Sequence, residues 1–205
     1  MAYSHLETEI ETQAFTAALA RLYGLEKSEE AKNRCKEVIN GFRETFRNDA
    51  EALFSAPGRT EIGGNHTDHN HGKVLAASVD LDTVAAAAKR DDGIIVEKSF
   101  KFDALEVDIS DLEVHTEEFG KSLGLIRGMC AGFKERGYNI GGFNAASMSR
   151  VLSGSGLSSS AAYEVLIGTI LNHLYNDGKV SPVEVAKIAQ YAENKYFGKP
   201  CGLLD

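Results

Sequence analysis

Apolar side chains in residues 28–46 recur with the period of an α-helix. They would share one helix face, which consists of Ala31, Cys35, Val38, Ile39, Phe42 and Phe46. Ser28 is a suitable N-cap, and the two glutamates after it would stabilise the positive end of the helix dipole. An amphipathic segment at residues 13–23 precedes this helix. The pattern predicts a helical extension over residues 1–50.

From residue 51 the apolar positions fall into short segments of the kind that form β-strands. These segments are rich in Val, Ile and Ala and are separated by Asp and Gly. The predicted strands are residues 73–81, 83–89, 93–102, 105–109 and 143–149. Asp91-Asp92-Gly93 is a hairpin signal, so the strands on either side of it are expected to pair.

Longer segments with helical periodicity come mainly after these strands. The predicted helices are residues 120–136, 158–175 and 183–196. Because strands come first and helices later, the order favours an α+β fold over a regular parallel βαβ array. We expect the extension at residues 1–50 to be followed by one domain at residues 51–205.

The composition limits the classes of partner that the chain is expected to have. It contains 22 basic and 30 acidic residues, which gives a net charge of −8. This balance argues against binding to nucleic acid or to an anionic membrane surface. The N-terminus lacks the features of a signal peptide, and no apolar stretch is long enough to span a bilayer. These features predict a soluble cytoplasmic protein that acts on a small molecule.

The cysteines give no sign of a metal site or of a disulfide framework. Cys35, Cys130 and Cys201 lie far apart, make an odd number and form no CxxC pair. We therefore expect reduced thiols, as is usual in the cytoplasm.

A loop rich in glycine and serine runs into the helix predicted at residues 158–175. Gly154 and Gly156 allow a close backbone approach and positive φ angles. The helix start offers N–H groups and a positive dipole end to a polyphosphate, and its serines could add a magnesium ligand. The loop is neither a Walker A sequence nor a GxGxxG turn. The alternative is an ordinary serine-capped helix after a flexible turn.

Residues 56–72 concentrate more functional groups than a solvated loop requires. They hold four glycines, one arginine, two acidic residues and three histidines. Arg59 offers a planar fork to a phosphate or carboxylate, and His66 and Asp68 offer donors and acceptors that suit sugar hydroxyls. A metal site is the alternative, with the candidate ligands His66, Asp68, His69 and His71. Adjacent side chains in an extended loop diverge, which argues against that alternative.

Residues 191–205 contain a third cluster. Glu193 lies late in the last predicted helix, which Gly198 and Pro200 would end, and a loop then leads to Asp205. Considered singly, Glu193 would belong to a solvated helix face and Asp205 would be only a terminal carboxylate. The functional roles of Glu193 and Asp205 can be inferred only together with the other two clusters.

Together, the three clusters resemble the motifs of the GHMP small-molecule kinases, and of the galactokinases in particular. The first family motif, GRxNxIGEHTDYNxG, is matched at Gly58-Arg59, Gly64, His66-Thr67-Asp68, Asn70 and Gly72. The second, PxxxGLSSSA, is matched over residues 156–161. The third, AE…G…CGxxDQ, is matched at Ala192-Glu193, Gly198, Cys201-Gly202 and Asp205. The motifs occur in the family's order and span residues 56–205.

The resemblance implies ATP-dependent phosphorylation of galactose at its C1 hydroxyl, in a domain that resembles domain 2 of ribosomal protein S5. Asp205 would be the catalytic base or electrostatic partner of that hydroxyl, and Arg59 would keep it ionised and face the transferring phosphoryl group. Ser160 and Glu193 would hold Mg²⁺. The implied ATP-binding residues are Gly154, Ser155, Gly156, Leu157, Ser158, Ser159 and Ser160. The implied substrate-binding residues are Arg59, Asn65, His66, Asp68, Gly202 and Asp205.

Departures from the family pattern concern the substrate more than the reaction. Asn65 replaces a glutamate that bonds a sugar hydroxyl, Glu61 replaces an asparagine, His69 replaces a tyrosine, and Leu152 replaces the proline of the second motif. A kinase for N-acetylgalactosamine or arabinose and a catalytically silent sugar sensor are therefore alternatives. The retained catalytic and metal-binding residues argue against the sensor, because binding alone would not need all of them.

The chain ends at Asp205, before the glutamine that usually follows in the family. The family continues into a second domain that completes the sugar pocket. We therefore expect a truncated chain that exposes apolar surface and turns over negligibly by itself. The oligomeric state is left open.

Overall fold

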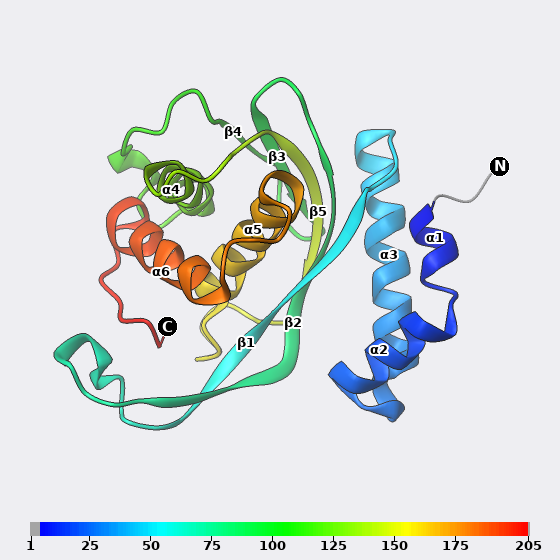
Figure 1. Cartoon of the computed structure of the whole chain (residues 1–205), viewed down its shortest axis with the longest axis horizontal. Helices are drawn as coiled ribbons and strands as arrows, with labels where there is room; N and C mark the ends of the chain where they lie inside the picture. The colour runs from blue at the N-terminus through cyan, green and yellow to red at the C-terminus, as the bar shows by residue number, and fades with distance from the viewer. Residues whose placement is uncertain (1–4, 205) are drawn as a thin grey trace.

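A five-stranded β-sheet with helices on both faces forms the centre of the molecule, as a computed structural model shows (Figure 1). The structure describes residues 5–204. The strands are ordered β1-β2-β5-β3-β4 across the sheet. Their bounds are Ala52–Gly63 for β1, Leu75–Lys89 for β2, Ile94–Ser99 for β3, Leu105–Asp108 for β4 and Phe143–Ser149 for β5. The predicted α+β class is confirmed.

Strand β5 lies between two strands that are consecutive in the sequence. It pairs antiparallel with β2 and parallel with β3, while the pairs β1–β2 and β3–β4 are antiparallel. The hairpin predicted at Asp91-Asp92-Gly93 is therefore wrong, because β2 and β3 are not neighbours. Gly93 does turn the chain with a φ of 72°, but a turn does not decide which strands pair. Ala145 and Ala146 of β5 are buried in the cores on opposite faces, as a central strand requires.

Strands β1 and β2 form a long antiparallel ribbon, and the loop with the candidate residues His66 and Asp68 lies at its tip. β2 is one strand where two were predicted, and β1 continues to Gly63 through residues that were expected to form a loop. Asp82 is the reason for the first error, since an acidic residue in an apolar run indicates a break. In the fold its carboxylate is buried and accepts hydrogen bonds, so the strand continues.

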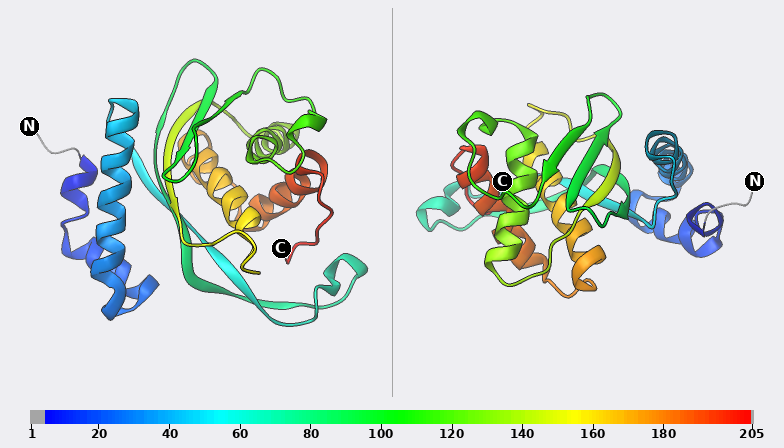
Figure 2. Two further views of the ribbon diagram at one scale, coloured as in Figure 1. Left: turned by 180° about the vertical axis from the view of Figure 1, so that it is seen from behind. Right: turned by 90° about the horizontal axis from the view of Figure 1, so that it is seen from above.

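Three helices cover one face of the sheet (Figure 2). They are α4 (Ser122–Glu135), α5 (Ser159–Asn176) and α6 (Pro182–Ala192), and a π-helical turn at Glu193–Phe197 extends α6. Short 3₁₀ turns lie at Leu25–Lys27, Thr67–Asn70 and Thr116–Glu118. The three helices predicted for this part of the chain are confirmed. Within residues 5–204, no helix has the length and apolar character that crossing a membrane would need.

The N-terminal helices cover the opposite face of the sheet (Figure 1). They are α1 (His5–Glu9), α2 (Gln13–Tyr23) and α3 (Ser28–Phe46), so both predicted N-terminal helices are confirmed. Ser28 is not the N-cap, because it lies inside the first turn and its hydroxyl donates to the Leu25 carbonyl at 2.8 Å. The division into an extension and a domain at residue 51 stays a prediction.

A buried ion pair joins these N-terminal helices to the sheet. Nη2 of Arg34 on α3 lies 2.8 Å from Oδ1 of Asp82 on β2, and the two residues are 5% and 2% exposed. The hydroxyls of Tyr23 and Ser55 donate to Oδ2 of the same carboxylate, each at 2.5 Å. Burial and the Asp82 carboxylate raise the pKa of Tyr23 to about 12, so its phenol stays a donor. This cluster fixes where the helices dock.

Cys35, Cys130 and Cys201 are free cysteines in the structure. Cys35 and Cys130 are buried, and burial raises the pKa of Cys35 to about 11 and that of Cys130 to about 12. Because the thiolate is the reactive form, both side chains act as core residues.

Candidate active site

Three segments that are distant in the sequence meet on one side of the molecule. They are the tip of the β1–β2 ribbon, the loop between β5 and α5, and the C-terminal segment (residues 198–204) after the π-helical turn. In Figures 1 and 2 the teal ribbon tip curves beneath the red C-terminal segment. Hydrogen bonds join all three segments. These are the same three clusters that the sequence indicated.

A tight turn at the ribbon tip directs Asp68 toward the C-terminal segment. Within the 3₁₀ turn Thr67–Asn70, the Thr67 hydroxyl donates to the Gly64 carbonyl at 2.7 Å. Gly72 closes this turn, because a Cβ atom there would lie 2.1 Å from the Thr67 hydroxyl oxygen. Glycine is therefore required for the loop to fold back on itself.

The Asp68 carboxylate binds the backbone of the C-terminal segment. Its Oδ2 accepts a hydrogen bond from the Leu204 N–H at 3.0 Å. A Cβ atom on Gly202 would lie 2.0 Å from the same oxygen, so a side chain there would displace Asp68. Burial raises the pKa of Asp68, but hydrogen bonds from the N–H groups of Leu204 and Leu203 outweigh it and lower the pKa overall. Asp68 is thus an ionised anchor for this segment.

Arg59 connects the loop before α5 to the C-terminal segment. Its Nε donates to the Leu204 carbonyl at 2.7 Å, and its Nη1 donates to the Gly156 carbonyl at 2.8 Å. The Arg59 backbone N–H also donates to the Leu157 carbonyl at 3.2 Å. The guanidinium therefore lies beside the residue that precedes Asp205 in the sequence. Asp205 itself lies outside the described residues.

The glycine–serine loop (residues 151–158) presents its backbone at the start of α5. Gly154 and Gly156 both have a φ of 76°, and Ser158 has a φ of 56°, all in the left-handed region. Ser158 is the N-cap residue, but within the described chain its side chain makes no capping hydrogen bond. The alternative of an ordinary serine-capped helix is therefore wrong. Such a helix start leaves backbone N–H groups for an anion.

Ser160 and Glu193 form a pair between the first turn of α5 and the π-helical turn. The Ser160 hydroxyl donates to Glu193 Oε1 at 2.8 Å. Glu193 is only 1% exposed, so its assignment to a solvated helix face is wrong. A hydroxyl and a carboxylate are hard oxygen ligands, and Mg²⁺ binds through one or two such groups together with substrate phosphates. The pair therefore fits a magnesium ion that arrives with a polyphosphate.

The histidine-rich stretch does not assemble a metal centre. The His66 N–H donates to Glu61 Oε1 at 3.1 Å, and His66 Nε2 lies 3.3 Å from Glu61 Oε2. His69 contacts the side chain of its neighbour Asn70. Among residues 5–204, no three His, Cys, Asp or Glu side chains are placed to hold a metal. The alternative metal site is therefore wrong for its candidates His66, Asp68, His69 and His71.

Sequence reasoning missed three side chains that order the C-terminal segment. Asn194 Oδ1 accepts a hydrogen bond from the Cys201 N–H at 2.6 Å, and Gln190 Nε2 donates to the Cys201 carbonyl at 3.1 Å. Lys199 Nζ lies 3.1 Å from Glu193 Oε1. The i, i+4 spacing of Gln190 and Asn194 was a signal that both share one helix face. No local signal indicated the contact of Lys199.

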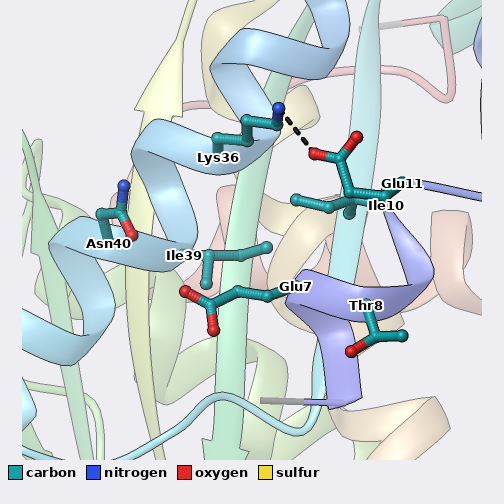
Figure 3. A pocket seen from close by; sticks show the side chains of 7 residues that line it. All are labelled: Glu7, Thr8, Ile10, Glu11, Lys36, Ile39 and Asn40. Carbon is teal, nitrogen blue, oxygen red and sulfur yellow. Dashed lines mark ion pairs between the residues drawn. The ribbon is translucent and has the colours of Figure 1, made fainter. Parts of the chain in front are cut away.

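A cavity of about 550 Å³ lies away from this site, between α1 and α3 (Figure 3). The three charged side chains that line the cavity all have partners, since Lys36 lies 2.6 Å from Glu11 and Glu7 lies 2.8 Å from Arg43. A smaller cavity of about 30 Å³ lies between α5, α6 and the C-terminal segment, with Glu193 in its wall. Only the smaller of these two cavities adjoins the three clusters.

Comparison with known proteins places the chain in a family. A model described as the galactokinase galactose-binding signature matches residues 40–89, and one described as the GHMP kinases N terminal domain matches residues 124–205. The galactokinase of Clostridium beijerinckii is 38% identical over 166 residues, which are 80% of this chain and 42% of that protein. The chain belongs to the GHMP kinase family, in its galactokinase group. The three clusters of this GHMP kinase chain all fall within the two matched ranges.

Other members agree with this placement. The galactokinase of Streptomyces coelicolor is 36% identical over 80% of this chain and 42% of its own length. The crystal structure of Lactococcus lactis galactokinase complexed with galactose superposes with a TM-score of 0.74 and 32% identity, covering 83% of this chain and 45% of that one. Mevalonate kinase from Methanococcus jannaschii, at 15% identity and a TM-score of 0.61, shares the fold alone. This GHMP kinase chain spans less than half the length of the curated relatives it matches.

Proposed function

We propose that the protein is a galactokinase, which transfers the γ-phosphate of ATP to the C1 hydroxyl of galactose with the help of Mg²⁺. The observation that carries the proposal is the convergence of the three clusters. Arg59 bonds both the glycine–serine loop and the C-terminal segment, and Asp68 bonds that segment from the ribbon tip. The reaction would take place in the cytoplasm, where free thiols such as those of this chain persist.

The sugar would bind between the ribbon tip and the C-terminal segment. Asp68 anchors this region, while the side chains of Asn65 and His66 are exposed to a ligand. Gly202 supports the assignment, because its missing side chain lets Asp68 approach the backbone. The complete proposed set for the sugar is Arg59, Asn65, His66, Asp68, Gly202 and Asp205.

The phosphates would bind at the start of α5. The loop from Gly154 to Ser160 offers backbone N–H groups and hydroxyls, and Ser160 with Glu193 offers two oxygen ligands to a metal ion. ATP would supply the phosphoryl group, and Mg²⁺ held by Ser160 and Glu193 would supply positive charge that offsets the negative charge of the phosphates. Phosphoryl transfer depends mainly on such positioning and charge, which is what this arrangement provides.

Asp205 and Arg59 would act on the transfer itself. The oxygen of the C1 hydroxyl would form a bond to the γ-phosphorus while the bond from that phosphorus to the departing ADP oxygen breaks. Asp205 would accept the hydroxyl proton, and Arg59 would stabilise the charge on the phosphoryl oxygens. The contact of Arg59 with Leu204, the neighbour of Asp205, supports this joint role.

The proposed function is tested by assaying the whole protein against a panel of sugars. We expect formation of galactose 1-phosphate with MgATP, and much slower reaction with glucose. Detection is by coupled ADP release and by ³¹P NMR of the product. Faster phosphorylation of N-acetylgalactosamine or arabinose would show that the substrate is a different sugar, while the proposed reaction type would stand. Galactose binding without any ADP release would favour the sugar sensor.

Asn65 is expected to tune the choice of sugar. It is exposed at the ribbon tip, and an amide both donates and accepts hydrogen bonds, whereas a glutamate only accepts. Asn65→Glu in the whole protein should change the ratio of kcat/KM values between galactose and its analogues by at least about tenfold, since one hydrogen bond to a charged group contributes about 1.5–3 kcal/mol. The measurement is a set of competing-substrate assays.

The control for this prediction is Asn48→Glu, which makes the same change at an exposed position after α3. It should leave the ratios unchanged. If Asn65→Glu also leaves them unchanged, position 65 does not face the sugar. Glu61, whose carboxylate contacts His66, would then be the next acid to replace.

A further inference from the structure

The ammonium group of Lys199 lies beside Ser160 and Glu193, the two residues proposed to bind Mg²⁺. Its Nζ lies 3.1 Å from Glu193 Oε1, the same oxygen that accepts the Ser160 hydroxyl at 2.8 Å. The Lys199 N–H also donates to the Glu193 carbonyl at 3.1 Å, so the backbone fixes the start of this side chain. Glu193 is 1% exposed, whereas the Lys199 side chain is 53% exposed. A buried carboxylate thus meets an ammonium group that reaches it from solvent.

Two cations cannot share this carboxylate oxygen without strong repulsion. If Mg²⁺ binds Glu193, as the proposed function requires, the ammonium group of Lys199 must leave that oxygen. Lysine is a point charge on a flexible four-carbon stem, so the ammonium group can move while the backbone stays in place. The anion closest to a metal on Glu193 and Ser160 would be the polyphosphate that the metal carries.

We infer that Lys199 is a second phosphate ligand of this kinase. In the absence of nucleotide its ammonium group neutralises Glu193, and when Mg²⁺ binds Glu193 the ammonium group moves to a phosphate oxygen. The inference rests on the proposed function. It adds a residue that the glycine–serine loop lacks, because residues 151–160 contain no lysine and offer phosphates only backbone N–H groups and hydroxyls. The ammonium group would come instead from a segment about 40 residues later.

This role predicts that loss of the Lys199 charge has opposite effects on the binding of the metal and of the nucleotide. Lys199→Met removes the charge but keeps most of the side chain. Binding of β,γ-imido-ATP with Mg²⁺ to the 205-residue chain should weaken about tenfold in isothermal titration calorimetry, because a charge-assisted phosphate contact is lost. Binding of Mn²⁺ alone, followed by EPR, should tighten at least about threefold, because no ammonium group competes for Glu193.

Two further variants separate this role from a structural one. Lys199→Arg keeps the charge and should retain nucleotide affinity within about threefold. Lys187→Met, on α6, removes a lysine with the same 53% exposed side chain, paired with Glu184, and should change neither affinity. If Lys199 only stabilised the structure, Lys199→Met would change the affinities for the nucleotide and for Mn²⁺ in the same direction. Circular dichroism confirms that each variant is folded.

The outcomes distinguish this inference from the proposed function. If the unaltered chain binds the imido-nucleotide and Lys199→Met binds it equally well, the inference is overturned and the kinase site stands. If Lys199→Met weakens Mn²⁺ binding, the inference is also overturned. If the unaltered chain binds neither Mn²⁺ nor the nucleotide, the inference fails, whereas the proposed function is decided separately by the sugar-panel assay of the whole protein.

Discussion

Replacing Asp205 with asparagine, or Arg59 with alanine, is expected to lower kcat of the whole protein by about 1,000-fold or more. The first change removes the proposed acceptor of the hydroxyl proton, and the second removes positive charge from the transferring phosphoryl group. Arg59 already contacts the backbone on both sides of the proposed reaction centre, at Gly156 and Leu204. Steady-state kinetics with galactose and MgATP measures the loss.

The double variant tests whether Asp205 and Arg59 act as a unit. Residues that act on the same step are strongly non-additive, so the double variant should be scarcely slower than either single variant. Galactose affinity should fall much less than the rate, because Asp68 and His66 remain. If Asp205→Asn keeps near-normal kcat, Asp205 is only a loop carboxylate, and the main mechanistic link to the galactokinases is lost.

Breaking the buried ion pair between Arg34 and Asp82 is expected to have the largest effect on stability. Arg34→Ala should lower the free energy of unfolding by about 3–5 kcal/mol, because it leaves a buried carboxylate without its charge partner. Tyr23 and Ser55 still donate to that carboxylate, but neither carries a charge. Urea unfolding of the 205-residue chain, followed by circular dichroism, measures the change.

A nearby exposed pair provides the matched control. Lys27 and Asp80 also join the N-terminal helices to β2, but their side chains are 56% and 43% exposed. Lys27→Ala should lower the free energy of unfolding far less than Arg34→Ala does, because water screens an exposed pair. Arg34→Met combined with Asp82→Leu should cost less than the sum of the two single changes, because no unpaired charge remains. Equal losses for Arg34→Ala and Lys27→Ala would show that the buried pair does not anchor the helices.

The sequence by itself determined the helices and the chemistry of the site. Helical periodicity is a local property, so the apolar face of residues 28–46 predicted α3 with the bounds that the structure has. The motifs were recognisable because each depends on residues close together in the chain. The glycines at positions 154 and 156, for example, adopt the positive φ angles that their residue type permits.

The tertiary structure alone decided which strands are neighbours. The turn at Gly93 indicated a hairpin, yet β5 inserts between β2 and β3 because its side chains are apolar on both faces. Strand pairing depends on long-range burial, which a turn signal does not contain. Asp82 likewise looked like a break until the fold supplied Arg34 as its partner.

The same distinction holds for the site. The sequence named Glu193, but its burial and its contacts with Ser160 and Lys199 depend on how α5, the π-helical turn and the C-terminal segment pack together. Residue type determines what a side chain can do chemically. Only the packed structure determines how far that side chain is buried and which partner it contacts, because the partner comes from a different part of the chain.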